Sequence, residues 1–283
     1  MTRFSLIVAT MGRDADIAVL LDSVLAQAWP DVEIIIVDQN RDERVAPIVT
    51  AYEKRLPITH LRTPRPHANA ARNLGLSRAG GDVVAFPDDD CILPPGTLAK
   101  VDRAFEHEGV DVLTGPAASP AGGLGSGRWN PESAPITLAN VWTSVIEFNL
   151  WLRREVALEL GGFDEKLGPG SVYGSAEGND LVARAIRAGH STWYERPLEI
   201  IHPDKRLSDV ATARAYAYGA GLGVVLARHR PAFGVWFAFF WRPLAGVVVS
   251  LLRGRLHHAG YYWQTFRGRL MGFRAQPGLD GAP

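Results

Sequence analysis

The chain has 283 residues, of which 47% are hydrophobic and 21% charged, and this composition excludes an intrinsically disordered protein. Its length suits one large α/β domain with an appendage, or two small domains. The single cysteine excludes an internal disulfide. We expect no signal peptide, because the apolar run at residues 4–9 is too short for one.

The formal net charge is zero, but the charges are unevenly distributed along the chain. Residues 1–209 hold 21 Lys and Arg and 29 Asp and Glu, whereas residues 210–279 hold nine Arg and no acidic residue. Such a split predicts an anionic partner for the C-terminal part, either a membrane or a nucleic acid.

The first third of the chain alternates between strand and helix patterns. Strands are expected at residues 4–9, 32–37, 58–61 and 82–86, and helices at 17–28, 41–55 and 68–79. Repeated strand–helix–strand units indicate a doubly wound α/β fold with a mostly parallel sheet.

The next part of the chain is less regular. A segment at residues 115–135 is rich in Gly, Ser and Pro and is expected to be a long loop, as is 168–178. The other expected elements are helices at 95–108, from 153 to 161 and at 180–188, and extended segments at 110–114, 147–152, 191–195 and 199–202.

Polar residues follow three of the expected strands. Because the carboxyl ends of parallel strands meet at one edge of a sheet, we expect these residues to converge on one crevice. They are Ala9 and Thr10, Asp38 and Gln39, and the run from Asp88 to Asp90.

The three consecutive carboxylates at 88–90 indicate a divalent cation. Adjacent anions repel one another unless a cation or hydrogen-bond donors lie beside them. Hard divalent cations prefer oxygen ligands. A metal–diphosphate site is therefore our interpretation, and a solvated acidic turn is the alternative.

The C-terminal part predicts helices that lie on a membrane. Residues 209–230 can form a helix, although three glycines weaken it, and 233–252 are mostly apolar. Arg242 and Pro243 fall in the middle of this second segment, so we expect two short helices at the interface and no spanning helix. The alternatives are a tail packed on the rest of the chain or a dimer contact. The apolar content disfavours nucleic acid.

Six short motifs occur in an order that resembles the family 2 glycosyltransferases, which are inverting enzymes with the GT-A fold. The likeness covers roughly residues 3–205. The matching segments are 7–13, Val37-Asp38-Gln39, Ala70-Ala71-Arg72-Asn73, the DXD motif Asp88–Asp90, 161–165 (Gly-Gly-Phe-Asp-Glu), and the Glu-x-x-Asp-Leu segment that begins at Glu177.

The resemblance implies roles for the residues in these motifs. Asp90 would ligate Mn²⁺ or Mg²⁺ together with Asp88 and His202. The nucleotide-binding residues would be Ala9, Thr10, Asp38, Gln39, Arg72, Asp88 and Asp89. Each of three assignments has a structural alternative. Asp38 could be a turn residue only, Arg72 could form a surface salt bridge, and His202 could be structural.

The general base is an open assignment. The residue after Glu177 is commonly the catalytic aspartate in the resembled family, and here it is Gly178. Glu177 and Asp180 are three residues apart and share a face if their helix begins early enough. Either carboxylate could therefore deprotonate the acceptor, and Glu177 is preferred because Gly178 allows it backbone freedom.

The resemblance implies a metal-dependent transfer of sugar from a nucleotide-sugar, with a UDP-sugar expected, to a hydroxyl of a glycan or lipid-linked acceptor in polysaccharide or glycoconjugate biosynthesis. We expect a GT-A catalytic domain at 1–208, with donor and acceptor halves at about 1–115 and 116–208. Residues 209–283 would form a helical appendage on the cytoplasmic face of an anionic membrane. The alternatives are a nucleotidyltransferase and a catalytically impaired binding or scaffold protein.

Overall fold

A computed structural model describes the whole chain except residues 108, 126, 205–208 and 276–283. Contacts within the chain divide it into two compact units, and each is described by itself. The first unit comprises residues 1–163 and 181–204, and the second comprises 164–180 and 205–283.

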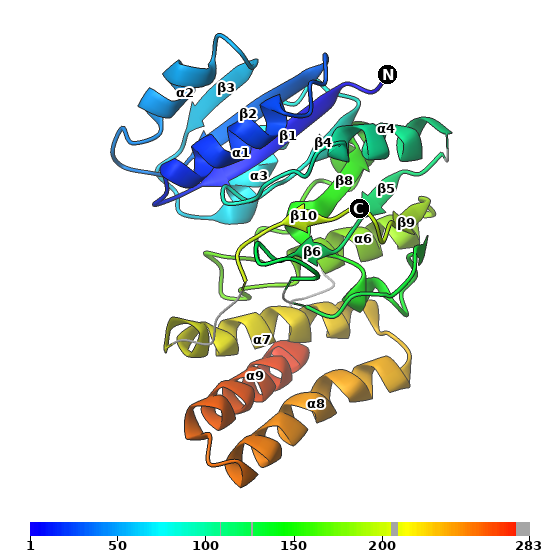
Figure 1. Cartoon of the computed structure of the whole chain (residues 1–283). Helices are drawn as coiled ribbons and strands as arrows, with labels where there is room; N and C mark the ends of the chain where they lie inside the picture. The colour runs from blue at the N-terminus through cyan, green and yellow to red at the C-terminus, as the bar shows by residue number, and fades with distance from the viewer. Residues whose placement is uncertain (108, 126, 205–208, 276–283) are drawn as a thin grey trace. The chain divides into compact units, whose positions relative to one another are not determined.

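An eight-stranded, mixed sheet organises the first unit (Figure 1). The strand order is β3-β2-β1-β4-β8-β5-β9-β7. Strands β3, β2, β1 and β4 run parallel, and β8 lies antiparallel between β4 and β5. The bounds are β1 (Phe4–Thr10), β2 (Val32–Asp38), β3 (Ile58–Arg62), β4 (Val83–Ala85), β5 (Val112–Thr114), β7 (Ala134–Pro135), β8 (Leu150–Arg153) and β9 (Thr192–Tyr194).

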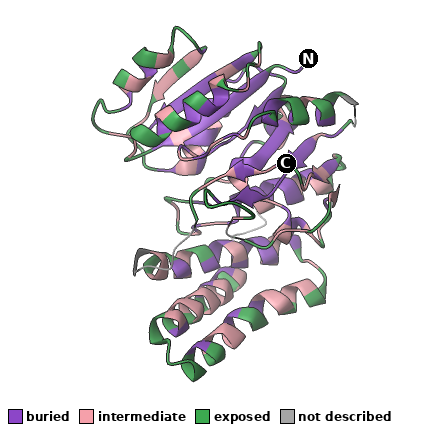
Figure 2. Ribbon diagram, in the orientation of Figure 1, coloured by how far each residue is buried: buried purple, intermediate pink, exposed green. Residues whose placement is uncertain are grey.

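Two hydrophobic clusters, one on each face of the sheet, form the core of the first unit. Successive side chains of a strand point to opposite faces, so Leu6 joins one cluster and Ile7 the other. Helices α1 (Ala15–Leu25) and α4 (Thr97–His107) supply the cluster with Leu6, and α3 (Ala68–Leu76), α5 (Arg154–Glu159) and α6 (Glu177–Ala188) supply the other. The core strands are fully buried (Figure 2), as their continuous apolar sequences predict.

The segment expected to be a loop at 115–135 contains strands, so that expectation is wrong in part. Strand β6 (Ala117–Ala118) pairs in parallel with β10 (Ile200–Ile201), and β7 joins the edge of the main sheet. Two further boundaries differ from expectation. A 3₁₀ turn at Glu147–Asn149 precedes β8, and α6 begins three residues earlier than predicted.

Three long helices dominate the second unit: α7 (Asp209–His229), α8 (Phe233–Leu252) and α9 (Leu256–Ala275). The glycines that lower the helix propensity of α7 let α9 approach closely. A Cβ atom at Gly219 or Gly223 would overlap the backbone of α9, and one at Gly268 or Gly272 would overlap the backbone of α7. Close packing therefore offsets the cost of glycine within these helices.

Helix α8 is continuous, so the expected break at Arg242 and Pro243 is wrong. Proline has no N–H, and the carbonyl four residues earlier, that of Phe239, loses its helical donor. The guanidinium of Arg269 on α9 donates to that carbonyl oxygen. A side chain from the neighbouring helix thus replaces the missing backbone hydrogen bond.

Candidate active site

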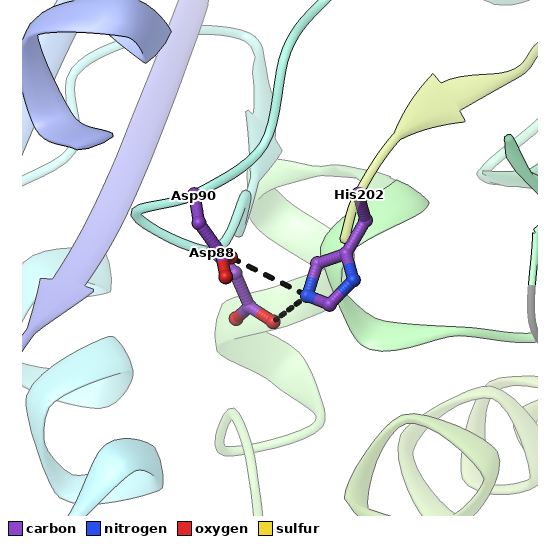
Figure 3. A group of neighbouring side chains, drawn as sticks. All are labelled: Asp88, Asp90 and His202. Carbon is purple, nitrogen blue, oxygen red and sulfur yellow. Dashed lines mark ion pairs between the residues drawn. The ribbon is translucent and has the colours of Figure 1, made fainter. Parts of the chain in front are cut away.

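Asp88, Asp90 and His202 meet at one place in the first unit (Figure 3). The two carboxylates follow the buried strand β4, and the histidine follows β10. Ile92 and Ile201 exchange backbone hydrogen bonds at 2.9 and 3.1 Å, which draws the chain after β10 against the acidic turn. One ligand atom from each of the three side chains lies within 4.8 Å of the other two.

The ring of His202 faces the two carboxylates through Nε2. This atom lies 3.3 Å from Oδ1 of Asp90 and 3.7 Å from Oδ2 of Asp88. Nδ1 lies 2.8 Å from the carbonyl oxygen of Pro203, which can only accept, so Nδ1 carries a hydrogen. In the neutral imidazole, Nε2 then presents a lone pair toward the carboxylates. The ring stacks on Phe148, with centroids 4.5 Å apart, and this contact fixes its orientation.

These three residues fit a divalent cation. Oδ1 of Asp90 is buried and accepts no hydrogen bond from the described residues. A lone pair of His202 opposite two carboxylate oxygens is repulsive unless a proton or a cation lies between them. Two carboxylates and one imidazole, with the second ring nitrogen bonded to a carbonyl, form a donor set suited to Mn²⁺ or Mg²⁺.

Arg13 pairs with the second and third carboxylates of the acidic run. Its guanidinium donates to Oδ1 of Asp89 at 2.7 Å and also contacts Oδ2 of Asp90. The two oxygens of Asp90 therefore have different partners, an arginine on one side and the His202 ring on the other. Sequence reasoning assigned Arg13 no role, although it lies in the loop after β1, at the edge of the sheet where the polar residues were expected to meet.

Asp89 is held inside the protein. Its side chain accepts hydrogen bonds from the hydroxyl of Thr10 at 2.7 Å and from Arg13. Burial raises the pKa of Asp89 to about 6, while the bonds from Thr10 and Arg13 oppose the rise and the neighbouring carboxylates add to it. The hydrogen bond from Thr10 to Asp89 thus connects the end of β1 to the acidic turn.

Arg72 orients the first carboxylate of the run. The side chain is buried, and it donates to Oδ1 of Asp88 at 3.0 Å and to Oδ1 of Asn69 at 3.1 Å. Its guanidinium also lies over the ring of Phe163, 5.4 Å from the centroid. The guanidinium is therefore buried, although the Asp88 side chain is 31% exposed, and the pair is not the surface salt bridge that stood as the alternative.

Asp38 ends β2 and is buried among polar partners. Its Oδ1 accepts hydrogen bonds from the backbone and the side chain of Asn40, both at 2.8 Å, and its Oδ2 lies 3.2 Å from Nε2 of His60. Gln39, the next residue, accepts a hydrogen bond at 2.6 Å from the backbone of His67. Sequence reasoning assigned no role to Asn40, which lies two residues after Asp38, and it missed His60 and His67 because they come from two other segments.

Ala9 and Thr10 lie beside these residues at the carboxyl end of β1. In the parallel register of β1 and β2, Ala9 is opposite Val37, and Thr10 is opposite Asp38. The polar groups expected at the ends of β1, β2 and β4 therefore share one edge of the sheet.

Glu177 and Asp180 are buried at the start of α6, within the second unit. The helix begins at Glu177, so the two carboxylates lie in its first turn. The preceding residue, Ala176, has a φ of 68°, a left-handed conformation that is uncommon for a residue with a Cβ atom. This turn aims the chain into the helix, and the backbone of Asp180 donates to the carbonyl of Ala176 at 2.9 Å.

Two side chains from α7, those of Arg228 and His229, contact Asp180. Its Oδ1 accepts a hydrogen bond from Arg228 at 2.7 Å and lies 2.8 Å from Nε2 of His229. The second nitrogen of the Arg228 fork donates to Oδ2 of Asp164 at 2.8 Å. The guanidinium therefore bridges two acidic motifs that the sequence placed sixteen residues apart.

Comparison with known proteins identifies the family. The chain matches the model of Glycosyl transferase family 2 over residues 5–158, which is more than half of its length. It is 25% identical to the glycosyltransferase AglE of Haloferax volcanii over 73% of this chain and 68% of that protein. It is 32% identical to the uncharacterized glycosyltransferase YwdF of Bacillus subtilis over 37% of this chain, and this match spans only 38% of YwdF.

Solved structures share the fold of the whole chain. The mannosyltransferase PcManGT of Pyrobaculum calidifontis, solved with GDP-Man and Mn²⁺, aligns with a TM-score of 0.67 and 17% identity over 99% of this chain and 88% of that one. TarS residues 1–349 of S. aureus, solved with UDP-GlcNAc, align with a TM-score of 0.63 and 16% identity over 94% and 90%. These likenesses show a GT-A type α/β sheet followed by a helical C-terminal region. Together with the family match, they establish that the chain belongs to glycosyl transferase family 2.

Proposed function

We propose that this glycosyltransferase moves a sugar from a nucleotide-sugar, specifically a UDP-sugar, to an acceptor hydroxyl in a reaction that depends on Mn²⁺ or Mg²⁺. The observation that carries the proposal is the buried Oδ1 of Asp90, which has no hydrogen-bond donor among the described residues and faces Nε2 of His202. A cation held there by Asp88, Asp90 and His202 would neutralise the charge that develops on the leaving diphosphate.

The surrounding side chains would bind and orient the donor. Arg72 and Arg13 hold the carboxylates Asp88, Asp89 and Asp90 in fixed positions, so that the ligand oxygens need little rearrangement. At the ends of β1 and β2, Ala9, Thr10, Asp38 and Gln39 would receive the nucleoside. The carbonyl oxygen of Gln39 already accepts from His67, which makes its amide nitrogen the group suited to a base.

An inverting transfer needs a general base for the acceptor hydroxyl, and we propose Glu177 for this role, with Asp180 as the alternative. Both lie in the first turn of α6. Asp180 accepts a hydrogen bond from Arg228, and the same oxygen lies 2.8 Å from Nε2 of His229, so this carboxylate already joins α6 to α7. We prefer Glu177 because the next residue, Gly178, allows it backbone freedom.

The proposed acceptor is a glycan or a lipid-linked glycan in polysaccharide or glycoconjugate biosynthesis, presented at the cytoplasmic face of an anionic membrane. One relative, 29% identical over 114 residues, is the GalNAc(5)-diNAcBac-PP-undecaprenol beta-1,3-glucosyltransferase of Campylobacter jejuni, whose name specifies a lipid-linked acceptor. Nine Arg without an acidic residue at 210–279 favour an anionic surface as the place where the acceptor is met.

Release of nucleoside diphosphate tests this function. The full chain is incubated with UDP-GlcNAc, other UDP-sugars and GDP-Man in Mn²⁺, and UDP, GDP and pyrophosphate are measured. We expect UDP from at least one donor and none in EDTA. Release of pyrophosphate would instead indicate a nucleotidyltransferase, and donor binding without release would indicate an impaired protein, as Gly178 in the usual base position allows.

A further inference from the structure

Helix α8 exposes a continuous apolar stripe along its whole length. Six large side chains form this outer stripe, and each is about half exposed or more. At 100° per residue they fall within roughly 100° of the helix circumference. They are Phe233, Phe237, Trp241, Val248, Leu251 and Leu252, with exposed fractions of 74%, 49%, 56%, 56%, 52% and 83%.

The inner face of α8 is already occupied by α9. The ring of Phe240 contacts Phe266 and Phe273 edge to face, with centroids 6.4 and 5.7 Å apart. Trp236 contacts Phe273 as well, at 5.7 Å. The outer stripe therefore remains uncovered, because α8 has two apolar faces and only one of them packs against α9. Figure 2 shows that exposed residues occur along α8. An exposed apolar surface of this length indicates an interaction site.

Of the helices in the described residues, only α8 has the length and composition to cross a membrane. Its charge lies in the wrong place for a spanning helix. Arg242 is exposed at mid-length, where a spanning helix would carry it to the centre of the bilayer. It lies roughly 130° around the helix from the middle of the stripe, at 100° per residue. If α8 lies flat, the stripe can enter the apolar layer while Arg242 stays at the level of the headgroups.

Charge identifies the partner of the stripe. Residues 210–279 contain nine Arg and no acidic residue, and Arg253 and Arg255 are exposed directly beyond the end of α8. Two copies of such a segment would repel each other, whereas anionic lipid would attract it. Phe237 stacks on Phe233 and on Trp241 along the stripe, and aromatic rings of this kind favour the depth of the membrane interface.

We propose that α8 lies in the plane of an anionic membrane surface, with the outer stripe at the boundary between headgroups and acyl chains. This proposal rests on the membrane partner proposed above, and it specifies which face of α8 contacts that membrane and how the helix is oriented. Catalysis is tested separately by nucleoside diphosphate release. An amphipathic helix bound in this way is held by apolar burial and by attraction between Arg and lipid headgroups.

The orientation is tested with an environment-sensitive fluorophore at single positions. The only native thiol, Cys91, is buried, so an introduced cysteine is the reactive one. The full chain is labelled after Phe237→Cys, Val248→Cys or Arg242→Cys and mixed with vesicles of equal phosphatidylglycerol and phosphatidylcholine. We expect emission at 237 and 248 to shift toward that of an apolar solvent, while emission at 242 stays close to that in water.

Two other outcomes would overturn the proposal. A spanning helix would bury the label at 242 most deeply. A dimer through the stripe would shift the emission at 237 and 248 with rising protein concentration in the absence of vesicles.

The energetic contribution of the stripe is tested by sedimentation with the same vesicles. The variant Phe237→Ser/Trp241→Ser should partition about tenfold less onto them. The matched control is Val19→Ser/Leu158→Ser, which removes two apolar side chains, 49% and 45% exposed, from the first unit and should bind like the wild type. Equal binding of the stripe variant and the wild type would overturn the docking surface but leave the membrane partner. Failure of the wild-type chain to bind would remove both.

Discussion

Arg228 and Asp180 form an ion pair at 2.7 Å, and the same guanidinium reaches Asp164 at 2.8 Å. The side chain of Asp180 is fully buried, whereas that of Arg228 is 26% exposed. The pair joins α7 to the first turn of α6, which carries Glu177. The C-terminal helices therefore help to fix the geometry of the proposed base.

Replacement of this arginine should destabilise the fold. Arg228→Gln leaves a buried carboxylate with less compensation, and we expect a loss of about 2–3 kcal/mol in the free energy of unfolding, below the range for a fully buried pair. The matched control is Arg214→Gln on the same helix, because Arg214 is exposed, and it should change stability by less than about 0.5 kcal/mol. Urea unfolding measures both variants, and equal stability of the two would contradict the role of the bridge.

Close packing of α7 and α9 predicts opposite effects for two Gly→Ala substitutions on one helix. A Cβ atom at Gly268 would overlap the backbone of Tyr216, and Gly268→Ala should cost about 1–3 kcal/mol. Gly260 has open space around its Cβ position, so Gly260→Ala should stabilise by about 0.5–1 kcal/mol. Thermal unfolding of both variants checks this, and destabilisation by Gly260→Ala would contradict it.

His202 should contribute directly to binding of the cation. His202→Ala removes one of three ligands, and we expect the affinity for Mn²⁺ to fall by about tenfold or more. Electron paramagnetic resonance measures free Mn²⁺ in a titration and needs no enzymatic turnover. His190→Gln serves as the control, since the ring of His190 lies near Asp111 and Glu159 instead. An unchanged affinity after His202→Ala would assign the histidine a structural role.

Asp38 should help to bind the nucleoside. A hydrogen bond to a charged group contributes roughly 1.5–3 kcal/mol, so Asp38→Asn should weaken UDP binding about tenfold or more. Because Asp38 also holds Asn40 and lies near His60, the thermal stability of the variant is measured alongside. Calorimetry of UDP binding gives the answer, and unchanged affinity in a folded variant would exclude the role.

Much of the fold could be predicted from the sequence because the signals are local. The buried strands before Thr10, Asp38 and Asp88 have continuous apolar runs, and polar residues follow each of them. Parallel strands place these residues at the same edge of a sheet. The mostly parallel sheet and the arrangement of its polar ends followed from these two facts.

Other features depend on contacts between distant segments. Arg13 and Arg72 pair with the acidic turn from different elements, and sequence spacing does not reveal which carboxylate each will meet. His202 reaches the same turn only because Ile92 and Ile201 pair. A lone histidine before a proline carries no such information.

The C-terminal helices show the same limit. Pro243 predicted a break, and the donor that permits a continuous α8 is Arg269, twenty-six residues later. The bounds of helix α9 within the expected helical appendage were not predicted, because its Gly, Arg and aromatic residues do not form one apolar face. The reason for its glycines is the close approach of α7, which leaves no room for a Cβ atom at Gly268 or Gly272.

The most direct test of the account is UDP binding by calorimetry, with and without Mn²⁺, in the wild-type chain and in Asp90→Asn. The buried Oδ1 of Asp90 faces His202, and its Oδ2 contacts Arg13. Asp90→Asn therefore removes the central carboxylate ligand and keeps the volume of the side chain. We predict that the wild-type chain binds UDP at least tenfold more tightly with Mn²⁺ than in EDTA, and that Asp90→Asn shows no such difference. Equal UDP affinity with Mn²⁺ and in EDTA for the wild-type chain would contradict a metal-bridged diphosphate.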